Sequence, residues 1–139
     1  MTPKEECEKM LDALLPFALD QLKKHSEFYP FGAVLLNNDE IRLTAADTGE
    51  EYPDSTLVIN QLTEAHKKQA EQENIRASGI CWNATVSLEN GVQTDAIIVS
   101  LEHRENYSVI VGQPYRFGFL KKLNLSNIFA QEGRHDIFD

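Results

Sequence analysis

The sequence predicts an α+β domain with the element order α-β-β-α-β-β-β, in which two helices pack on one face of a five-stranded antiparallel sheet. Two segments, at residues 3–25 and 54–73, carry apolar side chains at helical spacing. The other runs resemble strands, and two of them flank the turn dipeptide Asn90-Gly91. A chain of 139 residues is the size of one domain. We expect residues 1–120 to form its core and residues 121–139 to form an apolar C-terminal tail.

The first helix has a distinct start and end. Thr2 and Glu5 form a capping box, because the Thr2 hydroxyl can accept from the Glu5 amide while the Glu5 carboxylate reaches back to the Thr2 amide. Positive charge at residues 23–25 suits the negative end of the helix dipole. Pro16 removes one helical hydrogen bond, so we expect a kink there. The predicted buried stripe comprises Cys7, Met10, Leu11, Leu14, Leu15, Ala18 and Leu22.

A short hairpin follows the first helix. Residues 31–36 are almost wholly apolar, which is typical of a buried strand. Residues 41–45 alternate between apolar and polar, which is typical of a half-exposed strand. Asn37-Asn38-Asp39 supplies the turn between them, because Asn and Asp tolerate left-handed backbone.

The second helix begins at Asp54 or Ser55 and runs to about Glu73. His66 lies beside its charged sector, and we interpret it as a solvated side chain rather than a catalytic one. The side of the helix expected to face the sheet carries Leu57, Val58, Gln61, Leu62, Ala65 and Gln69.

A long hairpin at residues 80–99 is the strongest local signal. Asn90 and Gly91 favour a two-residue type I′ turn. That turn pairs apolar residues on one face, namely Ala84 with Ile97, Trp82 with Val99, and Ile80 with Leu101. A third strand at residues 107–111 follows, and we expect it to end at Gly112-Gln113-Pro114 because proline cannot donate to a ladder.

The segment after Tyr115 is too apolar for an exposed, disordered tail. We expect it to dock on its own domain or on a partner subunit. The open face of the sheet needs a cover, and either this segment or a second subunit could supply it. Its apolar residues are Phe117, Phe119, Leu120, Leu123, Leu125, Ile128, Phe129, Ile137 and Phe138.

The charge balance excludes some partners. With 13 basic and 22 acidic residues the net charge is −9, which opposes binding to nucleic acid and to anionic membranes. It is compatible with a basic protein partner. The start of the sequence lacks the basic and apolar regions of a secretory signal, so we expect a cytoplasmic protein. In that compartment Cys7 and Cys81 are expected to be buried free thiols.

The sequence carries no recognisable metal or catalytic motif. Glu102, His103 and Glu105 form the densest cluster of metal-ligand residues, but neighbours in a strand point to opposite faces, so Glu102 and His103 cannot share an ion. Cys81 has no base at a suitable register position. We therefore expect neither metal nor cofactor and assign no catalytic residue.

The alternative interpretation is a ligand pocket. It would lie near the residue 28–32 junction and the residue 80–111 hairpin. Asp95 is expected opposite Val86 on the apolar face, where it needs a partner such as Arg42, Arg76 or Arg116. The candidate ligand-binding residues are Phe31, Trp82, Asp95, Glu102, His103 and Tyr115.

Two resemblances accompany these patterns. The stretch Phe28-Tyr29-Pro30-Phe31-Gly32-Ala33-Val34, with Asp95-Ala96-Ile97-Ile98 and Leu101-Glu102-His103, resembles a group of small conserved bacterial proteins of unassigned function. The element order is similar to that of profilin-like domains of the roadblock and longin group. That likeness implies a dimeric scaffold for small GTPases or for motor or secretion complexes, although topology alone does not determine function.

Our main hypothesis is a non-enzymatic, acidic protein-interaction module that forms a homodimer. An immunity protein or a secretion-type chaperone would fit, because the acidic surface of such a protein faces a basic client. The alternative is a small-ligand-binding protein or enzyme that uses the pocket described above. The two differ in whether the polar candidates converge in one concavity.

Overall fold

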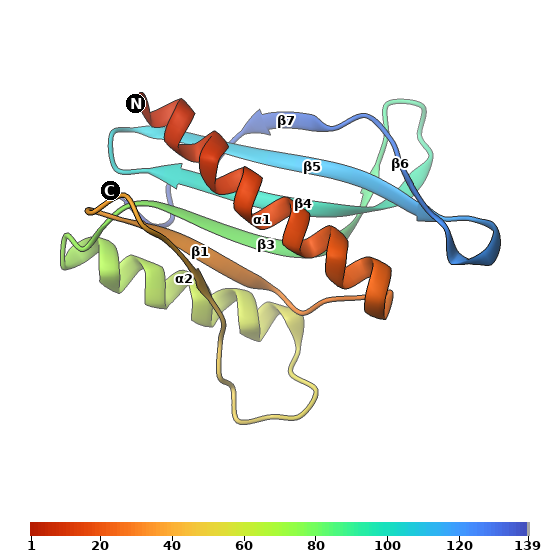
Figure 1. Ribbon diagram of the computed structural model, residues 1–139, viewed down its shortest axis with the longest axis horizontal. Helices are drawn as coiled ribbons and strands as arrows, with labels where there is room; N and C mark the ends of the chain where they lie inside the picture. Colours follow the sequence, from red (N-terminus) through yellow and green to blue (C-terminus); the bar gives the residue numbers. More distant parts are fainter. Residues whose placement is uncertain (139) are drawn as a thin grey trace.

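The computed structural model describes residues 1–138. These residues form two helices, one short 3₁₀ helix and seven strands (Figure 1). In chain order these are α1 Pro3–His25, β1 Phe31–Leu36, β2 Ile41–Thr44, α2 Ser55–Glu71, β3 Ile75–Ser87, β4 Gln93–His103, β5 Tyr107–Phe117, η1 Phe119–Lys121, β6 Leu123–Leu125 and β7 Phe129–Glu132.

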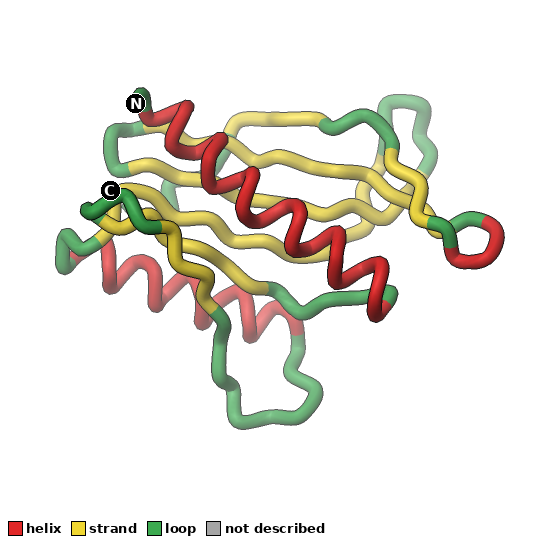
Figure 2. The backbone as a smooth tube through the Cα atoms, in the orientation of Figure 1, coloured by secondary structure: helices red, strands yellow, loops and turns green. Residues whose placement is uncertain are grey.

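The strands form one antiparallel sheet in the order β2-β1-β3-β4-β5, with β6 and β7 both paired to the outer side of β5. Figure 2 shows this curled sheet with loops at its ends. The predicted α+β class and the order α-β-β-α-β-β-β are confirmed up to β5. The prediction of five strands was too low, because the C-terminal residues add β6 and β7.

The two helices lie on opposite faces of the sheet, so the prediction that both share one face was wrong. Phe31, Ala33 and Leu35 of β1 belong to the cluster under α1. The alternate residues, Gly32 and Val34, face α2. A Cβ added to Gly32 would lie against the ring of His66 on that helix. Figure 1 shows α1 in front of the sheet and α2 on its other side. A strand buried on both faces explains the almost continuous apolar run of β1.

The α1 face forms the main core. The capping box is confirmed, since Thr2 and Glu5 exchange both expected hydrogen bonds. The helix continues through Pro16, which is exposed. Gly79 allows close approach, because a Cβ there would lie 2.5 Å from Leu14 Cδ1. The fully buried residues of the helix stripe are Cys7, Met10, Leu14, Ala18 and Leu22.

The long hairpin has a different register from the predicted one. Leu88 and Val92 close a three-residue turn, in which the Gly91 amide donates to Leu88 O (2.9 Å) and Gly91 adopts φ +80°. Asn90 is not left-handed, so the turn is not type I′. The register is therefore shifted by one, and Trp82 pairs with Ile98. Ile80, Trp82 and Ile98 face away from α1, while Cys81, Ile97 and Val99 lie beneath it.

Strand β5 does not end at Pro114, as predicted, but continues to Phe117. The edge strand is interrupted opposite the proline, between β6 and β7, where Ser126 donates to Pro114 O (3.1 Å). The Gln113 side-chain amide donates to Ser126 O (2.7 Å). Pro114 has no amide hydrogen to donate, but it lies where the pairing of β5 with its outer neighbour is already interrupted, so it does not end the strand.

The C-terminal residues pack on their own domain through β6, β7 and Ile137. Ile137 is 6% exposed and belongs to the cluster of Val58, Leu62 and Ile80 on the α2 face. Phe119 and Leu120, at the β5–β6 turn, remain 87% and 84% exposed.

Leu14→Ala should lower the free energy of unfolding by about 3 kcal/mol, because it leaves a cavity between α1 and β3. Leu43→Ala is the matched control, since Leu43 on β2 is 47% exposed. It should change stability by about 0.5 kcal/mol or less. Urea unfolding followed by circular dichroism measures both. Equal losses in the two variants would contradict the assignment of the core to the α1 face.

Candidate functional sites

The six candidate residues do not converge on one site. Phe31 is buried in the α1 core, where its ring packs edge-on against Phe17 and Phe28. The others divide among three places: a small cavity with Trp82 and Glu102, a surface depression around Asp95 with Tyr115 beside it, and a buried ion network that contains His103.

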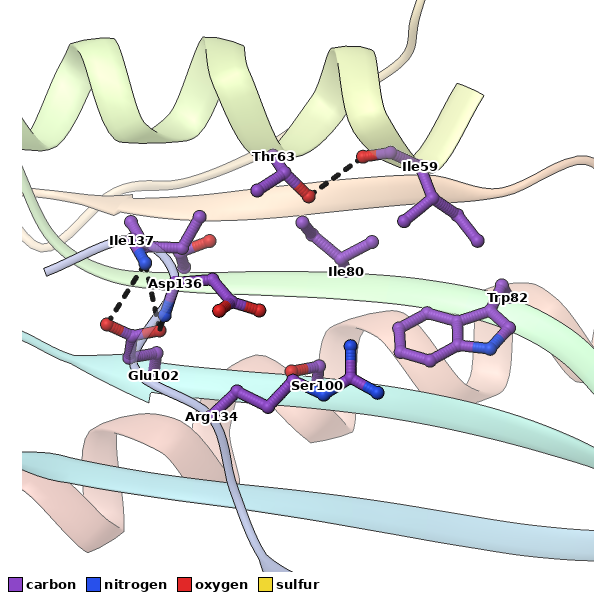
Figure 3. A pocket seen from close by; sticks show the side chains of 10 residues that line it. Ile59, Thr63, Ile80, Trp82, Ser100, Glu102, Arg134, Asp136 and Ile137 are labelled. Atoms are coloured by element: carbon purple, nitrogen blue, oxygen red, sulfur yellow. Dashed lines mark hydrogen bonds between the residues drawn. The ribbon is translucent and has the colours of Figure 1, made fainter. Parts of the chain in front are cut away.

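Trp82 and Glu102 line a cavity of about 40 Å³ between α2, β3, β4 and the C-terminal residues (Figure 3). Ile80 and Ile137 form apolar walls, and Ser100 adds a hydroxyl. The space is large enough for water but not for a metabolite. This cavity therefore belongs to the packing of the C-terminal residues and is not a substrate pocket.

Glu102 binds the main chain of the C-terminal residues. Its Oε1 accepts from the amides of Asp136 (2.9 Å) and Ile137 (3.1 Å), and its Oε2 accepts from those of Ile137 (3.2 Å) and Phe138 (2.6 Å). Burial raises the pKa of Glu102, and these amide hydrogen bonds oppose the rise without cancelling it.

His103 points to the opposite face, as the alternation of neighbouring strand residues predicts. Its Nδ1 accepts from the Glu105 amide (3.0 Å), so a neutral ring carries its proton on Nε2 and donates to Glu6 Oε1 (2.7 Å). Arg76 binds the other oxygen of Glu6. Burial alone would raise the pKa of Glu6, but the hydrogen bonds from Arg76 and His103 lower it overall. The network connects the start of α1 to β3 and β4 and leaves none of these groups free.

The prediction that His66 is solvated was wrong, because its side chain is 1% exposed. Its Nδ1 lies 2.7 Å from Ser78 Oγ and its Nε2 lies 2.8 Å from Thr44 Oγ1. Burial lowers the pKa of His66 to about 4, so the ring is neutral at pH 7. The signal was present in the i, i+4 spacing of Val58, Leu62 and His66.

A pocket of about 350 Å³ lies beside His66, between α2 and the β1–β2 hairpin. Val34 forms part of its apolar lining, and Arg42, Thr44 and Gln69 are among its polar residues. Thr44 lines this pocket, whereas Ser78 lines the cavity of Figure 3. The imidazole of His66 therefore connects a hydroxyl that lines the pocket, that of Thr44, with a hydroxyl that lines the small cavity, that of Ser78.

Asp95 lies in a third concavity, a depression of about 360 Å³ that also includes Glu27, Tyr29 and Asn83. Asp95 pairs with Thr85 rather than with Val86, a consequence of the shifted register. Beside it the Tyr115 hydroxyl donates to Asn83 Oδ1 (2.8 Å), and burial followed by the charge of Asp95 raises the pKa of that phenol. The expected ion pair with Arg42, Arg76 or Arg116 does not form within residues 1–138.

The two cysteines are buried and unpaired. Burial raises the pKa of Cys7 to about 12 and raises that of Cys81 as well, so both are thiols at pH 7. No three His, Cys, Asp or Glu side chains gather as a metal site in the described part of the chain. Its helices are too short or too polar to cross a bilayer.

Comparisons with protein-family models, curated proteins and solved structures found no match to this chain. The concavities must therefore be interpreted from their own chemistry. Of the three, only the depression around Asp95 combines exposed charge with an exposed aromatic side chain, Tyr29.

The burial of His66 makes stability dependent on pH. Its pKa in the folded protein, about 4, lies below the ordinary value of 6.5, so the unfolded chain binds the proton first as the pH falls. The stabilisation is complete above pH 6.5 and is lost between there and pH 4, by about 3 kcal/mol.

His66→Gln should therefore show a shallower loss of unfolding free energy than the wild type between pH 7 and about pH 4. His25→Gln, at an exposed histidine on the last turn of α1, is the control and should keep the steep loss. Urea titrations at each pH provide the measurement. Parallel pH profiles for wild type and His66→Gln would contradict the assigned burial.

Proposed function

We propose that this protein is a non-enzymatic, acidic interaction module that binds a basic segment of a partner protein in the depression around Asp95. The observation that carries this proposal is the lining of the depression. Glu27 and Asp95 are both exposed there, and Tyr29 is 49% exposed beside them. None of the residues that line this depression is Lys or Arg, whereas Arg116 lines the adjoining depression on the other side of Asp95. Carboxylates next to an aromatic ring suit a guanidinium or ammonium group.

The neighbouring loop supports the same partner chemistry. Residues 45–54 contain four acidic side chains and no basic one, and they lead into Ser55, which lines the depression. Tyr52 in this loop is 79% exposed. Together with the net charge of −9, this surface would attract a positively charged partner and accelerate its association.

A binding role also agrees with the pKa values of the buried histidine and cysteine, the groups that could act as a base or a nucleophile. A histidine with a pKa of about 4 is a weak base at neutral pH. A thiol with a pKa of about 12, that of Cys7, supplies little thiolate. The immunity-protein and secretion-chaperone roles are the specific forms of this proposal, because both use an acidic surface against a basic client.

A homodimer is the second part of the proposal. Phe119 and Leu120 expose large apolar side chains at one end of the sheet, and Leu120 adopts a left-handed φ of 57°. Exposed apolar groups held in an unfavourable backbone conformation are typical of contact sites. A roadblock-like scaffold role would require such a dimer.

Small-ligand binding is a second candidate function, favoured by the pocket beside His66 rather than by the junction at residues 28–32. An apolar lining with Arg42, Thr44 and Gln69 at its edges would suit a small amphipathic anion. Binding of such a compound would shift the NMR resonances of Thr44 and His66 and leave those of Asn83 unchanged.

The depression is tested with a fluorescein-labelled peptide of alternating Arg and Gly residues. Glu27→Gln combined with Asp95→Asn should weaken its binding by about tenfold, because two carboxylate contacts to guanidinium groups are lost. Fluorescence anisotropy at low and physiological ionic strength measures the dissociation constant, and binding should weaken as salt increases.

Asp12→Asn combined with Glu64→Gln is the matched control, since it removes the same charge from exposed positions on α1 and α2. It should change the dissociation constant by no more than about twofold. Equal weakening in both double variants would mean that the peptide senses only net charge, and the depression would then not be the binding site.

A further inference from the structure

The C-terminal segment, residues 134–138, is held mainly through its backbone. All of its hydrogen bonds to Glu102 come from main-chain amides, and Ser108 donates to the carbonyl of Arg134. Only one side chain, Ile137, is fully inserted. The groove that receives it is formed by Val58, Leu62, Ile80, Trp82 and Glu102.

Glu102 makes this groove depend on an occupant. The carboxylate is 4% exposed, and it forms no salt bridge within residues 1–138. An empty groove would deprive Glu102 of its amide hydrogen bonds and would expose Ile80 to water, so an occupant stabilises the groove. Whatever occupies the groove must supply several adjacent amides and an apolar side chain of the size of isoleucine.

The segment is joined to the rest of the chain by a small, peripheral element. Strand β7 comprises only Phe129–Glu132 and pairs on one side with β5, so its other edge is free within the described residues. Gly133 follows it, and the interruption at residues 126–128 precedes it. Figure 1 shows β7 along the outer edge of the sheet, and the chain after it turns behind the sheet toward β4 and β3, where Ile137 packs against Ile80.

We propose that the groove also binds the C-terminal segment of a second copy of this chain, so that two chains exchange residues 134–138. A second copy supplies the same amides and the same isoleucine, so every contact of the closed monomer forms again in the dimer. Exchange of identical elements about a two-fold axis is closed and does not propagate. This inference rests on the homodimer part of the proposed function and adds a contact at residues 134–138 to the one at Phe119 and Leu120; it does not involve the Asp95 depression.

The test uses two full-length variants, one in which only the groove is weakened and one in which only the C-terminal segment is weakened. Glu102→Gln weakens the groove and keeps the segment, whereas Ile137→Ser weakens the segment and keeps the groove. Each variant alone should sediment as a monomer at micromolar concentration, because neither contains both intact parts. Mixed one to one, they should form a heterodimer in which the segment of the Glu102→Gln chain occupies the groove of the Ile137→Ser chain.

Trp82 reports directly on the groove, because it is the only tryptophan in the chain and lines the cavity under Ile137 (Figure 3). The Glu102→Gln chain carries Trp82→Phe, so that only the receiving chain fluoresces. Emission of Ile137→Ser should shift to the red relative to wild type and return on mixing. The control partner, which combines Glu102→Gln, Ile137→Ser and Trp82→Phe in one chain, should neither dimerise nor restore the emission.

A mixture that stays monomeric up to a few hundred micromolar, with the emission of Trp82 unchanged, would overturn the proposal and leave an intrachain contact only. If either variant loses its folded circular dichroism spectrum, wild-type protein replaces it. Copies with labelled isoleucine are then mixed with unlabelled copies at millimolar concentration. Interchain contacts from Ile137 to Val58 would support exchange, and purely intrachain contacts would overturn it.

Salt distinguishes this inference from binding at the Asp95 depression. Two chains of charge −9 repel each other, so exchange should strengthen as salt screens the repulsion. Binding of the arginine peptide should weaken over the same range. The variant with Glu27→Gln and Asp95→Asn should therefore lose peptide binding without losing exchange. A failure of exchange would likewise not affect the result for peptide binding.

Discussion

The three-residue turn at residues 89–91 determines which face of the sheet each side chain of β3 and β4 occupies. It pairs Ala77 with His103 at one end of the hairpin and Ser87 with Gln93 at the other. A shift by one residue would move every side chain of one strand to the opposite face. Glu102 would then point toward α1 and could not bind the C-terminal amides.

Buried polar groups connect parts of the chain that are far apart in sequence. His66 joins α2 to β2 and β3 through two hydroxyls, and Glu102 joins β4 to residues 136–138. Glu6 joins the first turn of α1 to Arg76 and His103. Every buried side-chain nitrogen and oxygen among residues 1–138 has a partner. Because an unpaired buried group is costly, these links favour one arrangement of the helices, sheet and C-terminal segment.

The two proposed contacts use different chemistry at different surfaces. The depression around Asp95 offers exposed carboxylates and a tyrosine, where affinity depends on charge and salt. The groove beside α2 offers a buried carboxylate and an apolar socket, where affinity depends on desolvation and main-chain hydrogen bonds. On these two proposals, a basic client and a second copy of the chain would bind at separate surfaces and would not compete.

Local patterns were sufficient for features that depend on neighbouring residues. The capping box at Thr2, the buried stripe of α1, the alternation that separates Glu102 from His103 and the strand content of residues 31–36 could all be predicted, because each depends on contacts within a few residues or on backbone period. The thiols of Cys7 and Cys81 were also expected to be buried.

Features that depend on distant contacts were decided only by the tertiary structure. The sequence could not show that α2 crosses to the second face, since an amphipathic helix fits either side of a doubly buried strand. It could not show that His66 meets Thr44 and Ser78, because those partners lie on two other elements. Asn-Gly fits both a two-residue and a three-residue turn, so the sequence did not distinguish the register that places Cys81 under α1 from the one that places Trp82 there. Composition and local sequence patterns specified an acidic α+β chain, and the placement of its buried polar groups was decided by which elements meet in space.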